Sequence, residues 1–312
     1  MISRRTALSA AAACAVGGRS RPATAAATGL SWKTLAAHYY MSPCFAADHD
    51  LFARHGLPPV EVSLSTAPPT LLPAVIAGAI QVGVSTCIGV AMANDNGLDV
   101  KLLAGASVQE HGRPNTAILA APDSTLSRPA DFVGKRVVIP GVNGSFHVMF
   151  QKWMLDGGQD PKSVTYLEAG FAQAGDYLRN RSADAVLSTE PFMSRMLAAG
   201  IARKVADYFD PAEPMVFDSV FIVQGAWAAA NPKLIAGLRA TLNDALGQMR
   251  ADPAAAIATE VKWLHVPAEV AAGSGPAAPR CDITPADVQR WLDIAAQVGL
   301  ISRKPPAASL IA

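Results

Sequence analysis

KRVVIPGVNGSFHVMFQKW, residues 135–153, predicts a buried strand, a glycine-containing turn and an amphipathic helix. Residues 136–139 are largely β-branched, which favours a strand. Pro140, Gly141 and Gly144 then mark a turn, because proline and glycine are the strongest breakers of regular structure. The stretch therefore predicts an α/β unit in which a strand leads directly into a helix.

The helix after this turn is predicted from a candidate N-cap, Ser145, and from hydrophobic spacing. The apolar face consists of Phe146, Met149, Phe150, Trp153 and Met154. Such a strand–turn–helix directs unpaired backbone N–H groups and the positive end of the helix dipole at the space above it. The stretch favours an anionic or strongly accepting ligand group, with a packing role as the alternative.

Length and composition indicate an ordinary globular chain. Its 312 residues are enough for two domains, 51% of them are hydrophobic and 16% are charged. The net charge is +1 and the basic residues are scattered. Nucleic acid is therefore not expected as a partner.

Residues 1–27 have the features of a cleaved signal peptide. Arg4 and Arg5 precede an apolar run, and small residues in an A-x-A arrangement follow. The paired arginines favour the twin-arginine export route over an ordinary secretory signal, and a lipid anchor at Cys14 is disfavoured by its short preceding run. No later segment approaches the length of a membrane span, so an exported, periplasmic product is expected.

Three cysteines follow this leader: Cys44, Cys87 and Cys281. At most two of them can pair, so no disulfide framework is expected. A bridge between Cys44 and Cys87 is one alternative in an oxidising compartment. Three unpaired, mostly buried thiols are the favoured one.

Strands and helices alternate along the chain, which predicts an α/β fold with mainly parallel sheets. Residues 34–40 are the first expected strand and residues 45–55 the first expected helix. Ligands bind beyond the carboxyl ends of strands in such sheets. The predicted strands end near residues 39–42, 85–86, 106–109 and 188–190.

Two apolar strands, residues 116–121 and 216–223, are candidate crossovers between domains. The chain beyond the second one is mostly helical, with Pro at the expected start of three helices. We therefore expect residues 28–119 and 218–312 to form one discontinuous lobe and residues 120–217 to form an inserted second lobe.

Catalytic motifs are not evident. Ser145 and His147 lack the G-x-S-x-G context, and the segment around His49 lacks metal-ligand spacing. The glycines at 141 and 144 lack the third glycine of a dinucleotide-binding turn. The sequence thus favours a binding protein over an enzyme, and no cofactor is expected.

Several short motifs together resemble one family. They are DLFARHGL at residues 50–57, AGAIQVG at 77–83, DFVGKRV at 131–137, DAVLSTEPF at 184–192, ITPAD at 283–287 and VGLI at 298–301. They are similar to motifs of the periplasmic substrate-binding proteins of ABC importers in the nitrate/taurine/sulfonate group, which share their fold with pyrimidine-precursor synthases. The resemblance implies a bilobal type 2 periplasmic-binding-protein fold, with two mixed, mainly parallel sheets, flanking helices and a two-strand hinge.

The same resemblance implies a ligand cleft between the lobes. The positions that match it are Tyr39, Ser42, Pro43, Ser85, Thr86, Asn143, Ser145, Phe146 and Glu190. Gln109, His111 and Asp218, near the crossovers, are additional candidates. Gln81 replaces a common aspartate of the family, and Thr189 replaces a tryptophan that would form an aromatic wall.

The leading hypothesis is a monomeric binding protein that delivers a small organic anion, of the sulfonate or aromatic carboxylate type, to an ABC permease. Glu190 opposes this choice if it faces the ligand, and it favours an amine-bearing or pyrimidine-like solute instead. A pyrimidine-precursor synthase and a sensor that signals by lobe closure are the remaining alternatives. The export leader and the missing cysteine-rich run disfavour the synthase.

Overall fold

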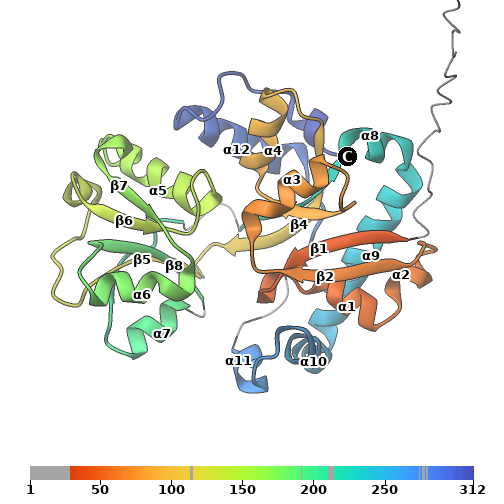
Figure 1. The fold of residues 1–312 in the computed structure, drawn as a ribbon, viewed down its shortest axis with the longest axis horizontal. Helices are drawn as coiled ribbons and strands as arrows, with labels where there is room; N and C mark the ends of the chain where they lie inside the picture. The colour runs from red at the N-terminus through yellow and green to blue at the C-terminus, as the bar shows by residue number, and fades with distance from the viewer. Residues whose placement is uncertain are drawn as a thin grey trace, which may run out of the picture.

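The structure is a computed structural model that describes residues 29–112, 115–190, 192–209, 214–273, 275, 278 and 280–312. The predicted signal peptide and Cys14 lie outside the described residues. The described chain forms hydrogen-bonded sheets of two, three and five strands, and a β-bridge joins the first two into one layer. The joined layer and the five-stranded sheet, each flanked by helices, lie side by side in Figure 1. This is the bilobal arrangement that the sequence predicted.

The first sheet contains the amino-terminal strands. Strands β1 (Leu30–Leu35) and β2 (Val60–Ser65) pair in parallel, and β3 (Gly83–Ser85), β10 (Met215–Gln224) and β4 (Val100–Glu110) form a second ladder in that order. A parallel bridge between Trp32 and Val82 joins the two ladders. Only β10 runs against the other strands, so the sheet is mixed and mainly parallel.

Helices from both ends of the chain cover this first sheet. The amino-terminal ones are η1 (His38–Tyr40), α1 (Ser42–Asp48), α2 (Leu51–Arg54), η2 (Pro68–Thr70), α3 (Leu71–Ile76) and α4 (Cys87–Asp95). The carboxyl-terminal ones are α8 (Gly225–Ala230), α9 (Pro232–Ala251), α10 (Pro253–Leu264), α11 (Ala268–Ala272), α12 (Pro285–Gln297) and η5 (Ala307–Leu310). The contacts of α9 with α1 and of α12 with α4 show that the chain returns to its first lobe.

The second sheet has the strand order β7-β6-β8-β5-β9. Its strands are β5 (Thr116–Ala120), β6 (Arg136–Ile139), β7 (Thr165–Glu168), β8 (Ala185–Thr189) and β9 (Arg203–Ala206). Figure 1 shows α5 (Ser145–Asp156) on one face and α6 (Phe171–Arg179) with α7 (Phe192–Ala198) on the other. The short helices η3 (Pro129–Phe132) and η4 (Pro161–Ser163) flank β6 and β7.

Two connections join the sheets, one from β4 to β5 and one from β9 to β10. The predicted lobe boundaries at 119/120 and 217/218 fall within β5 and β10. Strands in one ladder move together, so we propose that the lobes divide at the two connections, after β4 and before β10, and the exact boundaries stay a prediction.

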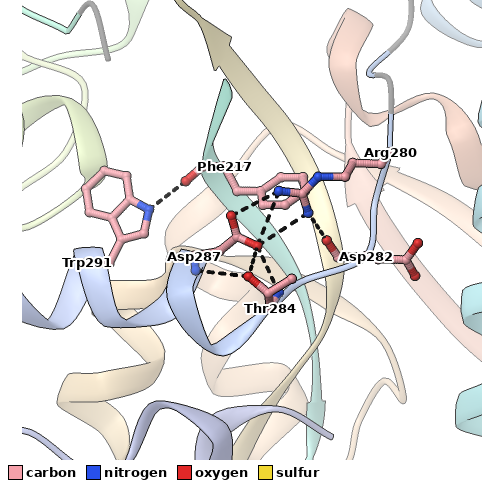
Figure 2. Close-up of polar contacts among 6 residues, drawn as sticks. All are labelled: Phe217, Arg280, Asp282, Thr284, Asp287 and Trp291. Atoms are coloured by element: carbon pink, nitrogen blue, oxygen red, sulfur yellow. Dashed lines mark hydrogen bonds and ion pairs between the residues drawn. The ribbon is translucent and has the colours of Figure 1, made fainter. Parts of the chain in front are cut away.

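Strand β10 contains a β-bulge. Phe217 pairs with Val108 and Ser219 pairs with Ser107, so Asp218 has no partner in β4. An extra residue of this kind breaks the ladder and redirects nearby side chains. The carbonyl of Phe217 accepts a hydrogen bond of 2.7 Å from Trp291 Nε1 on α12 (Figure 2).

The ring of Phe217 lies between Gly105 and the guanidinium of Arg280. A Cβ built on Gly105 would collide with this ring, and Arg280 lies 4.9 Å from its centroid. Arg280 also pairs with Asp287 at 3.0 Å. Figure 2 shows that Asp287 and Thr284 form the capping box that starts α12. Strand β4, strand β10 and α12 are therefore joined around one aromatic ring.

Two predicted elements near the amino terminus were misplaced. The first strand is β1, not residues 34–40, because alternate burial begins at Leu30 and a 3-10 turn occupies Tyr40. The predicted helix 45–55 is two helices, since Asp50 adopts a left-handed conformation with φ of 53°. The strand predicted at 136–139 matches β6.

Cys44, Cys87 and Cys281 are unpaired and buried, as the favoured alternative predicted. Burial is the main cause that raises the pKa of each thiol to about 12. Within the described residues, every helix is too short or too polar to cross a bilayer.

Replacement of Gly105 by alanine should lower the free energy of unfolding by about 1–3 kcal/mol, because the added methyl group overpacks the Phe217 ring. Gly247→Ala is the matched control. It lies inside α9 with open space at its Cβ position, and it should raise stability by about 0.5–1 kcal/mol. Urea denaturation checks both values, and equal effects of the two substitutions would contradict the packing argument.

Candidate functional site

A hydrogen bond between Asn115 and Tyr39 connects strand ends of the two sheets. In the first sheet, η1 follows β1, and Tyr39 of η1 accepts a hydrogen bond of 3.0 Å from Asn115 Nδ2. In the second sheet, the carbonyl of Asn115 accepts from Glu190 N and Thr189 Oγ1, both at 2.9 Å. Ligands bind at such strand ends in open α/β sheets. The candidate site is therefore the junction around Tyr39 and Asn115.

The first lobe brings two helix starts to this edge. Ser42 and Pro43 open α1, where proline is tolerated because it needs no N–H partner. Ser85 ends β3, and Thr86 is the N-cap of α4, with Oγ1 accepting from Gly89 N at 2.9 Å. The structure thus brings four of the predicted residues to the carboxyl ends of β1 and β3.

The second lobe contributes the start of α5. The helix begins at Ser145 and its N-cap is Gly144, so the prediction of Ser145 as N-cap was wrong by one residue. Ser145 is only 3% exposed. Within the described chain, neither its hydroxyl nor the N–H groups of Ser145, Phe146 and His147 have a hydrogen-bond partner. These donors and the helix dipole suit an anion or a strong acceptor.

The turn before α5 is held by a neutral histidine. Asn143 has a positive φ of 59°, and its N–H donates to His147 Nδ1 at 3.0 Å. Burial lowers the pKa of His147 to about 4, so Nδ1 is free to accept and Nε2 carries the proton. Nε2 lies 3.1 Å from Gln151 Nε2, and both nitrogens are donors in this tautomer. The Gln151 amide therefore pairs with His147 when it is turned so that its oxygen, which otherwise has no partner among the described residues, accepts the proton of Nε2. Asn143 was predicted as a ligand contact, and its positioning by His147 was not predicted.

Phe146 is part of an aromatic cluster. Its ring makes edge contacts with Phe171 at 5.3 Å and with Phe209 at 6.2 Å. Phe209 lies in the connection from β9 to β10, so the start of α5 contacts the hinge region directly.

The carboxylate of Glu190 is engaged within its own lobe. It accepts hydrogen bonds from Ser194 N at 3.2 Å and Ser194 Oγ at 2.8 Å, at the first turn of α7. This contact offsets part of the negative charge at the junction. Its predicted role as a ligand contact stays a prediction.

Asp218 and Gln109 form a buried polar cluster on the hinge strands. Asp218 accepts from Ser107 Oγ, from Gln109 Nε2 at 2.6 Å and from Ser219 Oγ at 3.4 Å. Ser219 also contacts Tyr40 Oη at 2.7 Å, which connects the cluster to η1. Burial raises the pKa of Asp218 above its ordinary value, although the hydrogen bonds from Ser107, Gln109 and Ser219 act in the opposite direction.

Gln109 Oε1, Asn115 Oδ1 and Thr116 Oγ1 are buried near this junction without a hydrogen-bond partner in the described structure. Buried polar atoms usually have partners, so these atoms mark places for a ligand or for water. Asn115, Ser107 and Ser219 were not among the predicted site residues. Ser107 and Gln109 share one strand face at i, i+2, a spacing that could have indicated the pair.

His111 lies beside the hinge, and its backbone N–H donates to the carbonyl of Pro214 at 3.1 Å. In the part of the chain that the structure describes, no group of three or more His, Cys, Asp or Glu side chains is arranged to hold a metal ion.

A family model, described as NMT1/THI5 like, matches residues 38–256. The chain belongs to this family. No curated protein sequence is significantly similar to it.

Solved structures show the same periplasmic-binding-protein fold. The alkanesulfonate-binding protein SsuA from Xanthomonas axonopodis pv. citri, bound to MOPS, is 23% identical with a TM-score of 0.73, covering 91% of this chain and 98% of SsuA. The nitrate-binding protein NrtA from Synechocystis PCC 6803 is 15% identical with a TM-score of 0.68, covering 90% and 84%. The desulfurization enzyme DSZB is 13% identical with a TM-score of 0.65, covering 91% and 96%. The predicted bilobal fold and family are confirmed.

Replacement of His147 by glutamine should flatten the acid side of the stability profile. The folded-state pKa of about 4 lies below the unfolded value near 6.5, so the unfolded chain takes up the proton first. Wild-type stability attributable to this group is full above about pH 6.5 and falls by about 1.4 kcal/mol per pH unit down to about pH 4. Urea unfolding from pH 4 to 8 measures it. The exposed His49→Gln variant controls for loss of a histidine, and parallel profiles for H147Q and wild type would refute the assignment.

Proposed function

We propose that this NMT1/THI5-like protein is an extracytoplasmic solute-binding protein that captures a small organic anion between its lobes and delivers it to an ABC permease. The observation that carries this proposal is the buried start of α5, where a hydroxyl and three backbone N–H groups have no partner among the described residues. The first N–H groups of a helix have no intrahelical partner, and together with the helix dipole and a neighbouring hydroxyl they favour an anion or a strong acceptor.

The two lobes would hold different parts of the solute. The start of α5 would bind the anionic group, with Ser85, Thr86 and Ser42 donating hydroxyl hydrogen bonds from the first lobe. Tyr39 and Phe146 would contact the organic part, because aromatic side chains supply large apolar contact area. The hydroxyl of Thr189 donates to the carbonyl of Asn115. Threonine has no ring, so this position adds no aromatic wall to the proposed cleft.

The charges near the junction agree with an anionic ligand. Glu190 accepts two hydrogen bonds from Ser194, and Asp218 accepts three from side chains of β4 and β10. These donors offset part of the repulsion that the two carboxyl groups would exert on an anionic ligand. The sulfonate type is supported by the structural similarity to SsuA, and nitrate by the similarity to NrtA.

A second candidate is a solute that carries an amine or a ring N–H. Gln109 Oε1 is a buried acceptor without a donor in the described chain, whereas Nε2 of the same side chain donates to the Asp218 carboxyl group. A donor on the ligand would satisfy it. The predicted export leader supports a periplasmic protein in either case, and the enzyme alternative predicts turnover of the bound solute.

Ligand class can be tested by thermal unfolding of the exported chain with panels of sulfonates, aromatic carboxylates, nitrate and amines. A ligand at 100 times its dissociation constant should add about 2.7 kcal/mol of stability. Stabilisation by amines or neutral compounds alone would reject the anion proposal.

The Ser145→Asp substitution tests the site. A carboxylate at the first residue of α5 suits the helix dipole but should repel the ligand, so affinity should fall at least tenfold, or about 1.4 kcal/mol, while the fold persists. Ser302→Asp introduces the same charge at an exposed position and should bind like wild type. Calorimetric titration gives both affinities, and unchanged binding by S145D would place the anion elsewhere.

A further inference from the structure

Three helices of the second lobe carry a phenylalanine within their first two residues. Phe146 is the second residue of α5, and Phe171 and Phe192 are the first residues of α6 and α7. The three helices follow β6, β7 and β8, which are parallel neighbours in the order β7-β6-β8. Each helix therefore starts at the carboxyl edge of the sheet, the edge at which ligands bind in open α/β folds.

The three rings contact one another past the ends of these strands. Phe146 makes an edge contact with Phe171, with ring centroids 5.3 Å apart, and Phe171 stacks on Phe192 at 5.9 Å. Figure 1 shows α5 on one face of the sheet and α6 with α7 on the other. Because the sheet separates these helices elsewhere, their rings meet over the strand ends. Phe146, Phe171 and Phe192 form the strand-end ring cluster.

The strand-end ring cluster is not fully absorbed by the protein interior. All three residues are half-buried. Among the described residues, neither Phe171 nor Phe192 is one of the side chains that pack against the two hydrophobic cores. A phenylalanine outside the core forgoes part of the free energy that its burial would contribute. Both rings therefore keep apolar surface that a ligand can cover.

This apolar surface borders the proposed anion site. Phe146 directly follows Ser145, whose hydroxyl has no partner in the described chain. On the other side of Ser145, Val142 lies in the turn before α5 and is 58% exposed. Its N–H donates at 3.4 Å to Glu168, the last residue of β7, so this turn also lies at the strand ends. An anionic group at Ser145 would have apolar and aromatic side chains beside it.

Rings at this position distinguish between kinds of organic anion. A flat aromatic ligand gains edge and stacking contacts with phenylalanine in addition to the apolar area that it buries. An alkyl ligand gains only the area contribution. Nitrate has no apolar part and gains neither contribution.

We propose that the strand-end ring cluster selects the organic part of the ligand, and that this protein prefers aryl anions to alkyl anions and to nitrate. The inference rests on the proposed function, because it takes the anion to be held at the start of α5. Phe171 and Phe192 are the specificity-determining residues, and neither was among the predicted site residues. The ligand class is an aromatic ring that bears a sulfonate or a carboxylate group.

The experiment compares benzenesulfonate with cyclohexanesulfonate, which carries the same anion on a saturated ring, by calorimetric titration of the folded chain. Wild type should bind the aryl compound about threefold or more tightly, because aromatic contacts add to the burial of area. Phe171→Leu and Phe192→Leu keep an apolar side chain without a ring. Each should lower the affinity ratio, and the double variant should bring it to about one.

Tyr177→Leu is the matched control. It removes a half-buried ring from a later turn of α6, where Tyr177 packs against the core of the second lobe, and it should keep the wild-type ratio. The urea midpoint of each variant confirms folding. Benzoate and cyclohexanecarboxylate repeat the comparison, and the pair that binds more tightly identifies the anionic group.

The Ser145→Asp variant separates this inference from the proposed function. It should weaken both sulfonates alike, at least tenfold, and leave their ratio unchanged. Equal affinities of wild type for the aryl and saturated compounds, or a wild-type ratio in the double variant, would overturn the ring selection and leave anion capture intact. An aryl preference that depends on Phe171 and Phe192 while S145D binds like wild type would support the ring cluster and overturn the anion position. Absence of binding of all four compounds and of nitrate would overturn both proposals.

Discussion

The hydrogen bond from Trp291 Nε1 to Phe217 O organises the centre of this molecule. The β-bulge in β10 removes Asp218 from the ladder with β4, and α12 supplies the donor for a carbonyl at that irregularity. A buried carbonyl left without a donor would cost about 1–3 kcal/mol, so this contact stabilises the bulge. The position of the carboxyl-terminal helix and the shape of the hinge strands are therefore set together.

The bulge also explains the buried polar cluster. Asp218, freed from the ladder, takes three hydrogen bonds from side chains on the same two strands, so its burial is compensated without a cation. Compensation is incomplete, because Gln109 Oε1 has no partner among the described residues and burial raises the pKa of Asp218. Burial disfavours the charged form of this carboxyl group, whereas its three hydrogen-bond donors favour that form. The electrostatics of the hinge strands therefore depend on how well these donors satisfy Asp218.

Local signals in the sequence predicted much of this fold, and long-range pairs explain what they missed. Strand β6 and the start of α5 were predicted within one residue, because β-branched residues, a glycine turn and helical spacing all lie within one short stretch. Strand β9 was not predicted, because it is a four-residue edge strand that pairs only with β5. The contact of Tyr39 with Asn115 joins residues 76 positions apart. The bulge at Asp218 depends on the register of β4 against β10. No spacing rule along the chain can specify such contacts, so the predicted site lacked Asn115, Ser107 and Ser219.

The stretch that identified the fold contributes to two surfaces. The start of α5 presents N–H groups without a partner among the described residues at the junction of the lobes, whereas Met149 and Trp153, one and two turns later, line a cavity of about 690 Å³ between α5 and α12. Because a helix is rigid over this length, a movement of the lobes that displaced Ser145 would also displace Trp153 relative to Trp291. The helix spacing that first suggested an ordinary amphipathic face therefore has a mechanical consequence. One face of α5 connects the proposed anion-binding end of the helix to the neighbourhood of the helix that supports the hinge strands.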